Sequence, residues 1–322
     1  MVWEIFIGSV IILLALDLGV FNRKAHNISH KEAAKWTMFW VVLALAFSGM
    51  IYWFYQSGHV DNPLHYSAKT AFSKYIQGYL LELSLSVDNI FVIAVIFRSF
   101  RIPQKYQHRV LFWGIIGAIV FRALMIFFGI WLINKIDWVT YIFGAFLIYT
   151  AYNMAFGGEE SEFNPKENKF FKLLRKIIPV TKGIHGQQLF VRRLGKWAAT
   201  PLFIALIIIE FTDILFALDS IPAVLAITED PFIVFSSNIM AILGLRSMYF
   251  FLANIMDKFS YLKFSLAVIL VFVGMKMMLH HYLKENNLEI PEWISLGIIV
   301  VSLAGGVVFS LIKNKQEERA ER

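Results

Sequence analysis

Residues 209–224 read IEFTDILFALDSIPAV, and this segment contains three carboxylates, Glu210, Asp213 and Asp219, in otherwise apolar surroundings. It belongs to the apolar run 200–226, and an α-helix needs roughly 20 such residues to cross a bilayer. Each charged residue near the bilayer centre costs on the order of 2.5–3.5 kcal/mol. The segment therefore predicts a membrane-spanning helix in which the acids have a function.

The composition agrees with a membrane location. Of the 322 residues, 58% are hydrophobic and 16% are charged. A soluble domain is nearer to about 45–50% apolar and about 25% charged. These values exclude an ordinary soluble enzyme and a disordered chain. The chain contains no Cys, which excludes disulfides and thiolate metal sites.

Apolar runs of sufficient length predict an all-α polytopic membrane protein with about nine transmembrane helices. The expected spans are 2–21, 36–55, 72–97, 110–133, 138–156, 200–226, 232–256, 262–281 and 293–312. Between 157 and 199 lies a long basic loop, in which residues 168–178 have the pattern of a short amphipathic helix. A plain tethering linker is the alternative for this segment.

Basic residues are distributed unequally between the two sides. One set of alternate segments contains 23 Lys and Arg residues, whereas the other contains four, Lys69, Lys74, Lys135 and Lys284. Because basic loops stay in the cytoplasm, we expect the N-terminus outside and the C-terminus in the cytoplasm. The basic loops are then membrane flanks, and we expect no nucleic-acid partner.

An internal repeat relates two groups of three spans. Glu82 and Asp88 align with Asp213 and Asp219, and Arg122 aligns with Arg246. Because each unit has an odd number of spans, the second copy is expected to be inverted, as in many secondary transporters. The predicted layout is two N-terminal helices (1–71), a first repeat (72–156), a cytoplasmic loop (157–199), an inverted second repeat (200–281) and a last helix with its tail (282–322).

The repeats place candidate metal ligands at corresponding positions. The candidates are Glu82, Asp88, Asn89, Glu210, Asp213, Asp219 and Ser220. Three interpretations compete: structural pairing with the intramembrane cations Arg122, Arg246 and Lys276, a proton relay, and a cation site. Pairing with these three cations would leave at least two of the five carboxylates without a positively charged partner. Oxygen ligands suit Mn²⁺, Ca²⁺ or Mg²⁺ and do not by themselves choose among them.

Pro222 refines the expected shape of the site. It has no N–H to donate to the carbonyl of Leu218, and its ring clashes with the preceding turn. The sequence therefore predicts a kink or an unwound segment between these two residues, beside Asp219. Interrupted helices in corresponding positions are the sequence feature that best indicates a transporter site.

These motifs resemble a known family. ELSLSVDNIFV (82–92) and the segment 209–224 are similar to the two acidic signatures of the TerC family, and the nine-span layout is similar to its Alx-like branch. The resemblance implies Mn²⁺ export across the bacterial cytoplasmic (inner) membrane, with the signature acids as the metal site. Another branch is tied to membrane-protein assembly.

The resulting expectation is a secondary exporter of Mn²⁺, with proton coupling left open. We expect no enzymatic activity and no permanent cofactor; the partners are the lipid bilayer and the transported divalent ion, and protein partners are not specified. A carrier for another divalent cation such as Ca²⁺, or a scaffold acting through loop 157–199, are the alternatives.

Overall fold

The structure is a computed structural model that describes most of the chain. The described residues are 2–16, 28–136, 138–157, 179–181, 183–193, 196–253, 261–286, 288 and 290–320. The predicted amphipathic helix 168–178 lies outside them.

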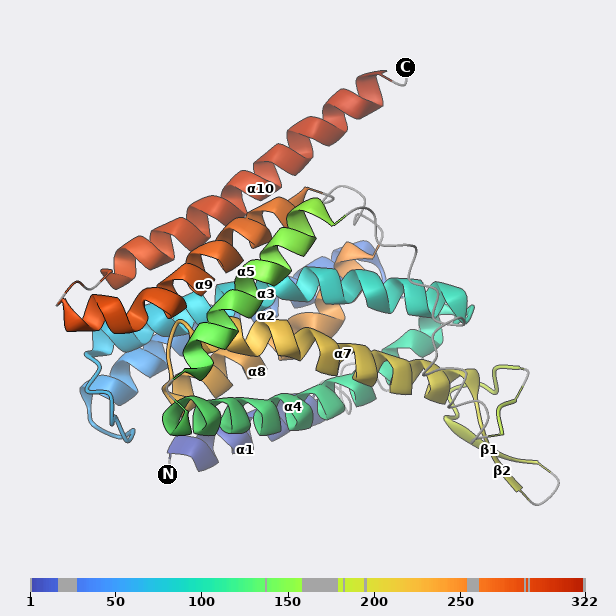
Figure 1. Ribbon diagram of the computed structural model, residues 1–322. Coiled ribbons are helices and arrows are strands. Elements are labelled where there is room, and N and C mark those ends of the chain that lie inside the picture. The colour runs from blue at the N-terminus through green and yellow to red at the C-terminus, as the bar shows by residue number, and fades with distance from the viewer. Residues whose placement is uncertain are drawn as a thin grey trace.

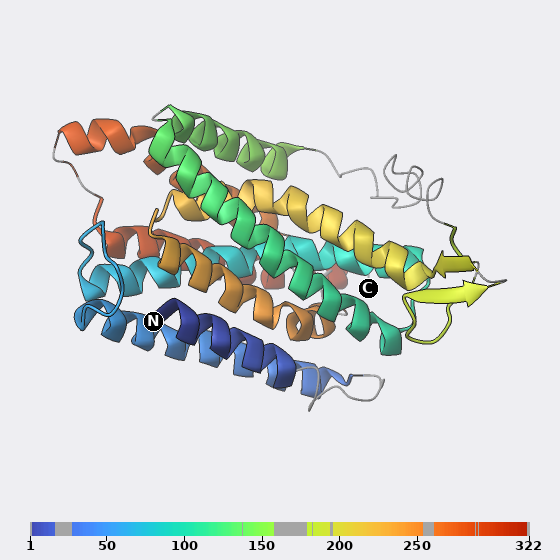
Figure 2. The same ribbon diagram turned by 90° about the horizontal axis from the view of Figure 1, so that it is seen from below.

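The described residues form nine α-helices and one β-hairpin (Figure 1). The helices are α1 (Val2–Leu16), α2 (His30–Gln56), α3 (Ala68–Ser99), α4 (Gln104–Lys135), α5 (Val139–Phe156), α7 (Pro201–Leu225), α8 (Pro231–Leu252), α9 (Leu262–Glu285) and α10 (Glu292–Ala320). Strands β1 (Phe190–Arg193) and β2 (Lys196–Ala199) pair antiparallel, with Phe190 opposite Ala199. Figure 2 shows this hairpin at one end of the bundle, beside the first turn of α7. The sequence did not predict the hairpin.

Eight helices of the described chain are long and apolar enough to cross a membrane, which confirms the all-α polytopic fold. The ninth, α1, has 15 described residues. At about 1.5 Å per residue it is shorter than the roughly 30 Å hydrocarbon core. The described chain thus agrees with the prediction of about nine transmembrane helices to within one helix, and residues 17–21 of the expected first span lie outside the described residues.

Helix starts are set by local chemistry. The side chains of Ser29 and Ser67 accept hydrogen bonds from backbone N–H groups in the first turns of α2 and α3. Asp230 does the same for α8, accepting from Phe232 and Ile233. Such caps satisfy donors that have no partner inside the helix. Proline begins α7 and α8, where its missing N–H costs nothing.

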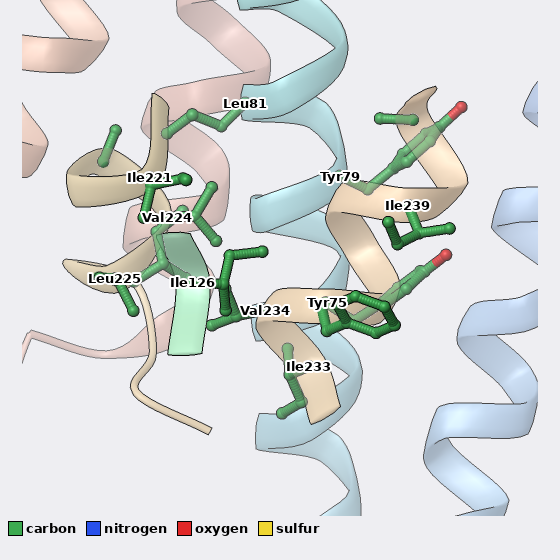
Figure 3. Close-up of a cluster of buried hydrophobic side chains, with 14 of the residues drawn as sticks. Tyr75, Tyr79, Leu81, Ile126, Ile221, Val224, Leu225, Ile233, Val234 and Ile239 are labelled. Atoms are coloured by element: carbon green, nitrogen blue, oxygen red, sulfur yellow. The ribbon is translucent and has the colours of Figure 1, made fainter. Parts of the chain in front are cut away.

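Helix α8 is the centre of the bundle. Nearly all of its membrane-length segment is buried, and it packs against α2, α3 and α4. Figure 3 shows part of the core around it, with Tyr75 and Tyr79 of α3 beside Ile239 of α8. By contrast, α5 and α10 are mostly unburied and expose large apolar side chains such as Tyr149 and Val301. The central helix is thus enclosed by protein, and the peripheral helices present apolar surfaces suited to lipid.

The helix pairings follow a pattern. Helix α3 packs on α8, α4 packs on α7, and α5 packs on α9. If α3 is exchanged with α7, α4 with α8, and α5 with α9, the same three pairs result. The pairing is compatible with two related units, but the inverted relationship itself stays a prediction.

The sequence predicted that α7 would kink or unwind near Pro222. The helix does not unwind there. It is helical from Pro201 to Leu225, so the proline lies inside the helix, close to its end. The chain loses one backbone hydrogen bond there, because proline cannot donate to Leu218. A ligand site built from an unwound segment is therefore not observed, while a kink stays a prediction.

A buried polar network fastens α10 to the bundle. Glu292 Oε1 lies 2.9 Å from Lys74 Nζ of α3 and 3.9 Å from Lys276 Nζ of α9, and its Oε2 accepts from Gln77 at 3.0 Å. Lys276 also donates to Ser295, at 3.2 Å. Lys74 was expected among the basic residues flanking the membrane, yet it is buried.

Replacing Glu292 with Gln should weaken this attachment. The substitution removes the carboxylate that lies against Lys74 and near Lys276, and because Glu292 is 25% exposed the loss should be smaller than the roughly 3–5 kcal/mol of a fully buried pair. We expect a lower thermal unfolding midpoint in detergent. The exposed Asp61→Asn is the matched control, because it removes a carboxylate from a loop. An unchanged midpoint for Glu292→Gln would show that the network contributes nothing.

Helices α5 and α9 touch at two glycines. A Cβ on Gly144 would lie 2.8 Å from the carbonyl oxygen of Gly274, and one on Gly274 would lie 2.9 Å from that of Gly144. No side chain fits between the two backbones, in the manner of small-residue contacts in membranes.

Gly144→Ala should therefore force the two helices apart and lower the unfolding midpoint. Gly297→Ala on α10 is the control, because a Cβ there meets nothing within 4 Å. Alanine favours a helix over glycine by about 1 kcal/mol, so the control should be neutral or stabilising. Equal midpoints for both variants would contradict the close crossing.

Candidate functional site

The guanidinium of Arg122 joins two of the predicted acids. Arg122 lies on α4, and its Nη2 and Nε donate to Asp213 Oδ1 and Oδ2 of α7, at 2.8 and 3.2 Å. Its Nη1 contacts Glu82 Oε1 of α3. Arg122 and Glu82 are 1% and 0% exposed, respectively. The structural-pairing interpretation therefore holds for these two acids.

A second donor reaches Glu82 from the central helix. Asn238 Nδ2 of α8 donates to Glu82 Oε2 at 3.0 Å, and both residues are buried. The carboxylate of Glu82 is thus held from two sides, by a charged and a neutral donor. The amide oxygen of Asn238 is buried without a hydrogen-bond partner.

Glu210 lies one helical turn before Asp213 and packs against α4. A Cβ on Gly117 would clash with both carboxylate oxygens of Glu210, so glycine at this position leaves the carboxylate its present place against α4. Its Oε2 is buried with no hydrogen-bond partner. Three carboxylates and one guanidinium thus gather where α3, α4 and α7 meet.

A small cavity opens beside Asp213. It lies among α3, α4, α7 and α8, and its polar lining comes from Asn89, Thr212 and Asp213. Gly114 of α4 faces it, along with apolar side chains including Ile93 and Phe216. Asn89 is buried and belongs to this lining. Asp213 is the carboxylate that joins this cavity to the charge cluster.

Gly114 belongs to the lining of the cavity and has no side chain that could fill it. At the offset that aligns Arg122 with Arg246, Gly114 corresponds to Asn238. Asn238 places its amide against Glu82, whereas Gly114 has no side chain to place against Asp213. On the predicted repeat, the two aligned acids therefore have different neighbours, with an amide beside Glu82 and the cavity beside Asp213.

The remaining predicted ligands have surroundings of their own. Asp219 Oδ1 accepts from Thr150 of α5 at 3.1 Å. The hydroxyl of Ser220 is buried without a hydrogen-bond partner. Asp88 is half-buried and has an interaction partner, as does the buried Arg246. Lys276 belongs to the Glu292 network and does not balance the signature acids.

Within the described residues, no three acidic or histidine side chains are placed to hold one metal ion. The predicted ligand set is therefore not assembled as a single closed cage. What the structure brings together is a smaller group, Glu82, Asp213 and Glu210, with Arg122 among them and Asn89 across the cavity.

Two contributors escaped sequence reasoning. Thr150 could not be connected with Asp219, because a single hydroxyl in an apolar helix gives no signal of its partner. The relation of Gly117 to Glu210 was not predicted, because it depends on which faces of α4 and α7 meet. The repeat alignment contained a usable signal for Gly114, since it stands where the other unit has Asn238.

Comparison with known proteins identifies relatives along the whole chain. The profile of the "Integral membrane protein TerC family" matches residues 67–318. An uncharacterised membrane protein of Myxococcus xanthus is 48% identical over 97% of this chain and 92% of its own length. Alx of Escherichia coli K12, named as a proposed membrane-bound redox modulator, is 43% identical over 93% of this chain and 90% of its own length. No solved structure matches.

The family profile covers the helices that supply the charge cluster and the cavity. The acidic signatures lie within that range, as do Arg122 and Asn238. The protein is therefore a multi-pass integral membrane protein that belongs to the TerC family.

Proposed function

We propose that the protein is a secondary transporter that exports Mn²⁺ from the cytoplasm of a bacterial cell through its inner membrane. The observation that carries the proposal is the group of three intramembrane carboxylates beside a small, mostly apolar cavity whose polar lining is Asn89, Thr212 and Asp213.

The charge of the cluster favours a divalent ion. With the carboxylates ionised, Glu82, Glu210 and Asp213 carry three formal negative charges against one on Arg122. A charge of this sign inside a membrane calls for a cation or protons to offset it. Carboxylate, amide and hydroxyl oxygens suit Mn²⁺, Ca²⁺ and Mg²⁺, and the family resemblance favours Mn²⁺ among them.

Orientation follows from the basic residues. Arg98 and Arg101 at the α3–α4 turn and Arg192 of the hairpin belong to one end of the bundle, where Tyr106, Leu189 and Phe203 share a core. Under the positive-inside rule this end faces the cytoplasm, which puts the C-terminus there and the N-terminus outside.

The name of the Alx relative raises a redox role as another possibility. These 322 residues contain no Cys, so thiol–disulfide exchange by the chain's own side chains is excluded. An influence on redox state would have to act through the ion moved or through another protein. The scaffold alternative places its contact in loop 157–199, of which the described part includes the hairpin.

Asp213→Asn should abolish Mn²⁺ flux in liposomes while the protein still inserts. The substitution keeps the size of the side chain and removes the charge between Arg122 and the cavity. Flux is followed with a Mn²⁺-sensitive dye inside the vesicles, with and without an imposed pH gradient, and with Ca²⁺ and Mg²⁺ as competitors. Asp61→Asn, an exposed loop variant, is the matched control. Wild-type flux in Asp213→Asn would remove this acid from the transport site.

Filling the cavity should also slow transport. A Cβ on Gly114 would make only ordinary contacts, at 3.6 Å from Ile209 and 3.9 Å from Leu206. Gly114→Ala should therefore keep most of the flux, whereas Gly114→Leu should lower it roughly tenfold or more by occupying the space beside Asp213. If both variants transport at the same rate in the dye assay, the ion does not pass through this cavity.

A further inference from the structure

We infer that Arg122 is a built-in counter-cation of the carrier, holding Glu82 and Asp213 when no ion is bound and releasing Asp213 when a divalent cation enters. This inference rests on the proposed function, because it concerns how the same site chooses and releases its ion. It assigns Arg122 the role of a specificity-determining residue.

The contacts of Arg122 are those of a cation occupying an ion site. Its guanidinium lies between carboxylates of two different helices, α3 and α7, and is itself carried by a third, α4. Both oxygens of Asp213 receive a donor from it, in the paired geometry that arginine makes with carboxylates. A cation entering from the cavity would meet Asp213 first and would have to compete with this pair.

Glu82 and Asp213 depend on Arg122 to different extents. Glu82 is fully buried and also accepts from Asn238, so it stays hydrogen-bonded if the guanidinium moves. The Asp213 side chain is 14% exposed and lines the cavity opposite Asn89. Asp213 is therefore the exchangeable end of the bridge, and Glu82 is the fixed end.

A built-in cation also stabilises the carrier when no transported ion is bound. After release, two bare carboxylates in the membrane would each cost on the order of 2.5–3.5 kcal/mol. With Arg122 between them, one positive charge offsets part of this cost without proton uptake by either acid. The ion-free protein can then change conformation with its acids still paired.

Competition with an arginine discriminates by charge. A monovalent ion brings the same formal charge as the guanidinium but lacks its directed donors, so it gains nothing by displacing it. A divalent ion brings twice the charge to the same carboxylate. The bridge thereby disfavours Na⁺ and K⁺ and admits divalent ions, whichever of these the cell supplies.

The test measures Mn²⁺ binding to the purified full-length protein in detergent by isothermal titration calorimetry, with and without excess Na⁺. Arg122→Gln removes the competing charge. Arg122→Lys keeps the charge but cannot donate to both oxygens of Asp213 in the paired geometry of a guanidinium. Lys135→Gln is the matched control, because it removes one positive charge from the exposed last turn of the same helix. Folding of each variant is checked by its elution profile and thermal midpoint.

We expect Arg122→Gln to bind Mn²⁺ about tenfold more tightly than wild type, and Arg122→Lys to show a smaller gain. Na⁺ should weaken Mn²⁺ binding in Arg122→Gln and leave the wild type unaffected. Lys135→Gln should behave as the wild type. A residue that only held the helices together would not raise affinity or expose the site to Na⁺.

Equal or weaker Mn²⁺ binding by folded Arg122→Gln would overturn the inference while leaving the proposed function standing. If that variant does not fold, Arg122→Lys decides, and the absence of any gain in its affinity is the contrary result. If no form of the protein binds Mn²⁺, including the wild type, the proposed function fails and the role of Arg122 falls with it.

Discussion

The burial of a guanidinium between two carboxylates constrains the rest of this structure. Arg122, Glu82 and Asp213 come from three helices, and none of them can be left without its partners inside the bundle. Breaking such a buried pair costs several kcal/mol, far more than a typical surface contact. The register of α4 against α3 and α7 is thus fixed by charge as well as by shape, and the apolar core packs around that arrangement.

The central position of α8 follows from this constraint. Its Asn238 completes the hydrogen bonding of Glu82, and its remaining surface is apolar and enclosed by α2, α3 and α4. The asymmetry of the site arises at one position, where α8 has an amide and α4 has Gly114. On the predicted repeat, this one difference gives Glu82 an amide neighbour and leaves Asp213 beside the cavity.

Much of the fold was predictable from hydropathy, because a lipid-exposed backbone must be helical and about 20 residues long. The pairing of Arg122 with signature acids was also within reach, since a buried charge in a membrane needs a partner. Sequence could not assign Lys276 to Glu292, because the glutamate was placed just before the expected span 293–312. It also placed the acids in one group, whereas their distribution around α3 and α7 depends on how the helices rotate against each other. Asp219, beside Thr150, therefore lies apart from Asp213. The hairpin was missed because four-residue strands in a basic loop leave no periodic pattern.

The crossing of α5 and α9 at Gly144 and Gly274 has a mechanical consequence. The side chains of Met278, Ile148 and Leu147 close around the two glycines, so the backbones meet inside a ring of packed neighbours. A change in the angle between the helices would push these side chains against the facing backbone. The crossing therefore acts as a clamp that holds α5 and α9 together as one unit, and any larger movement of this pair would carry both helices along.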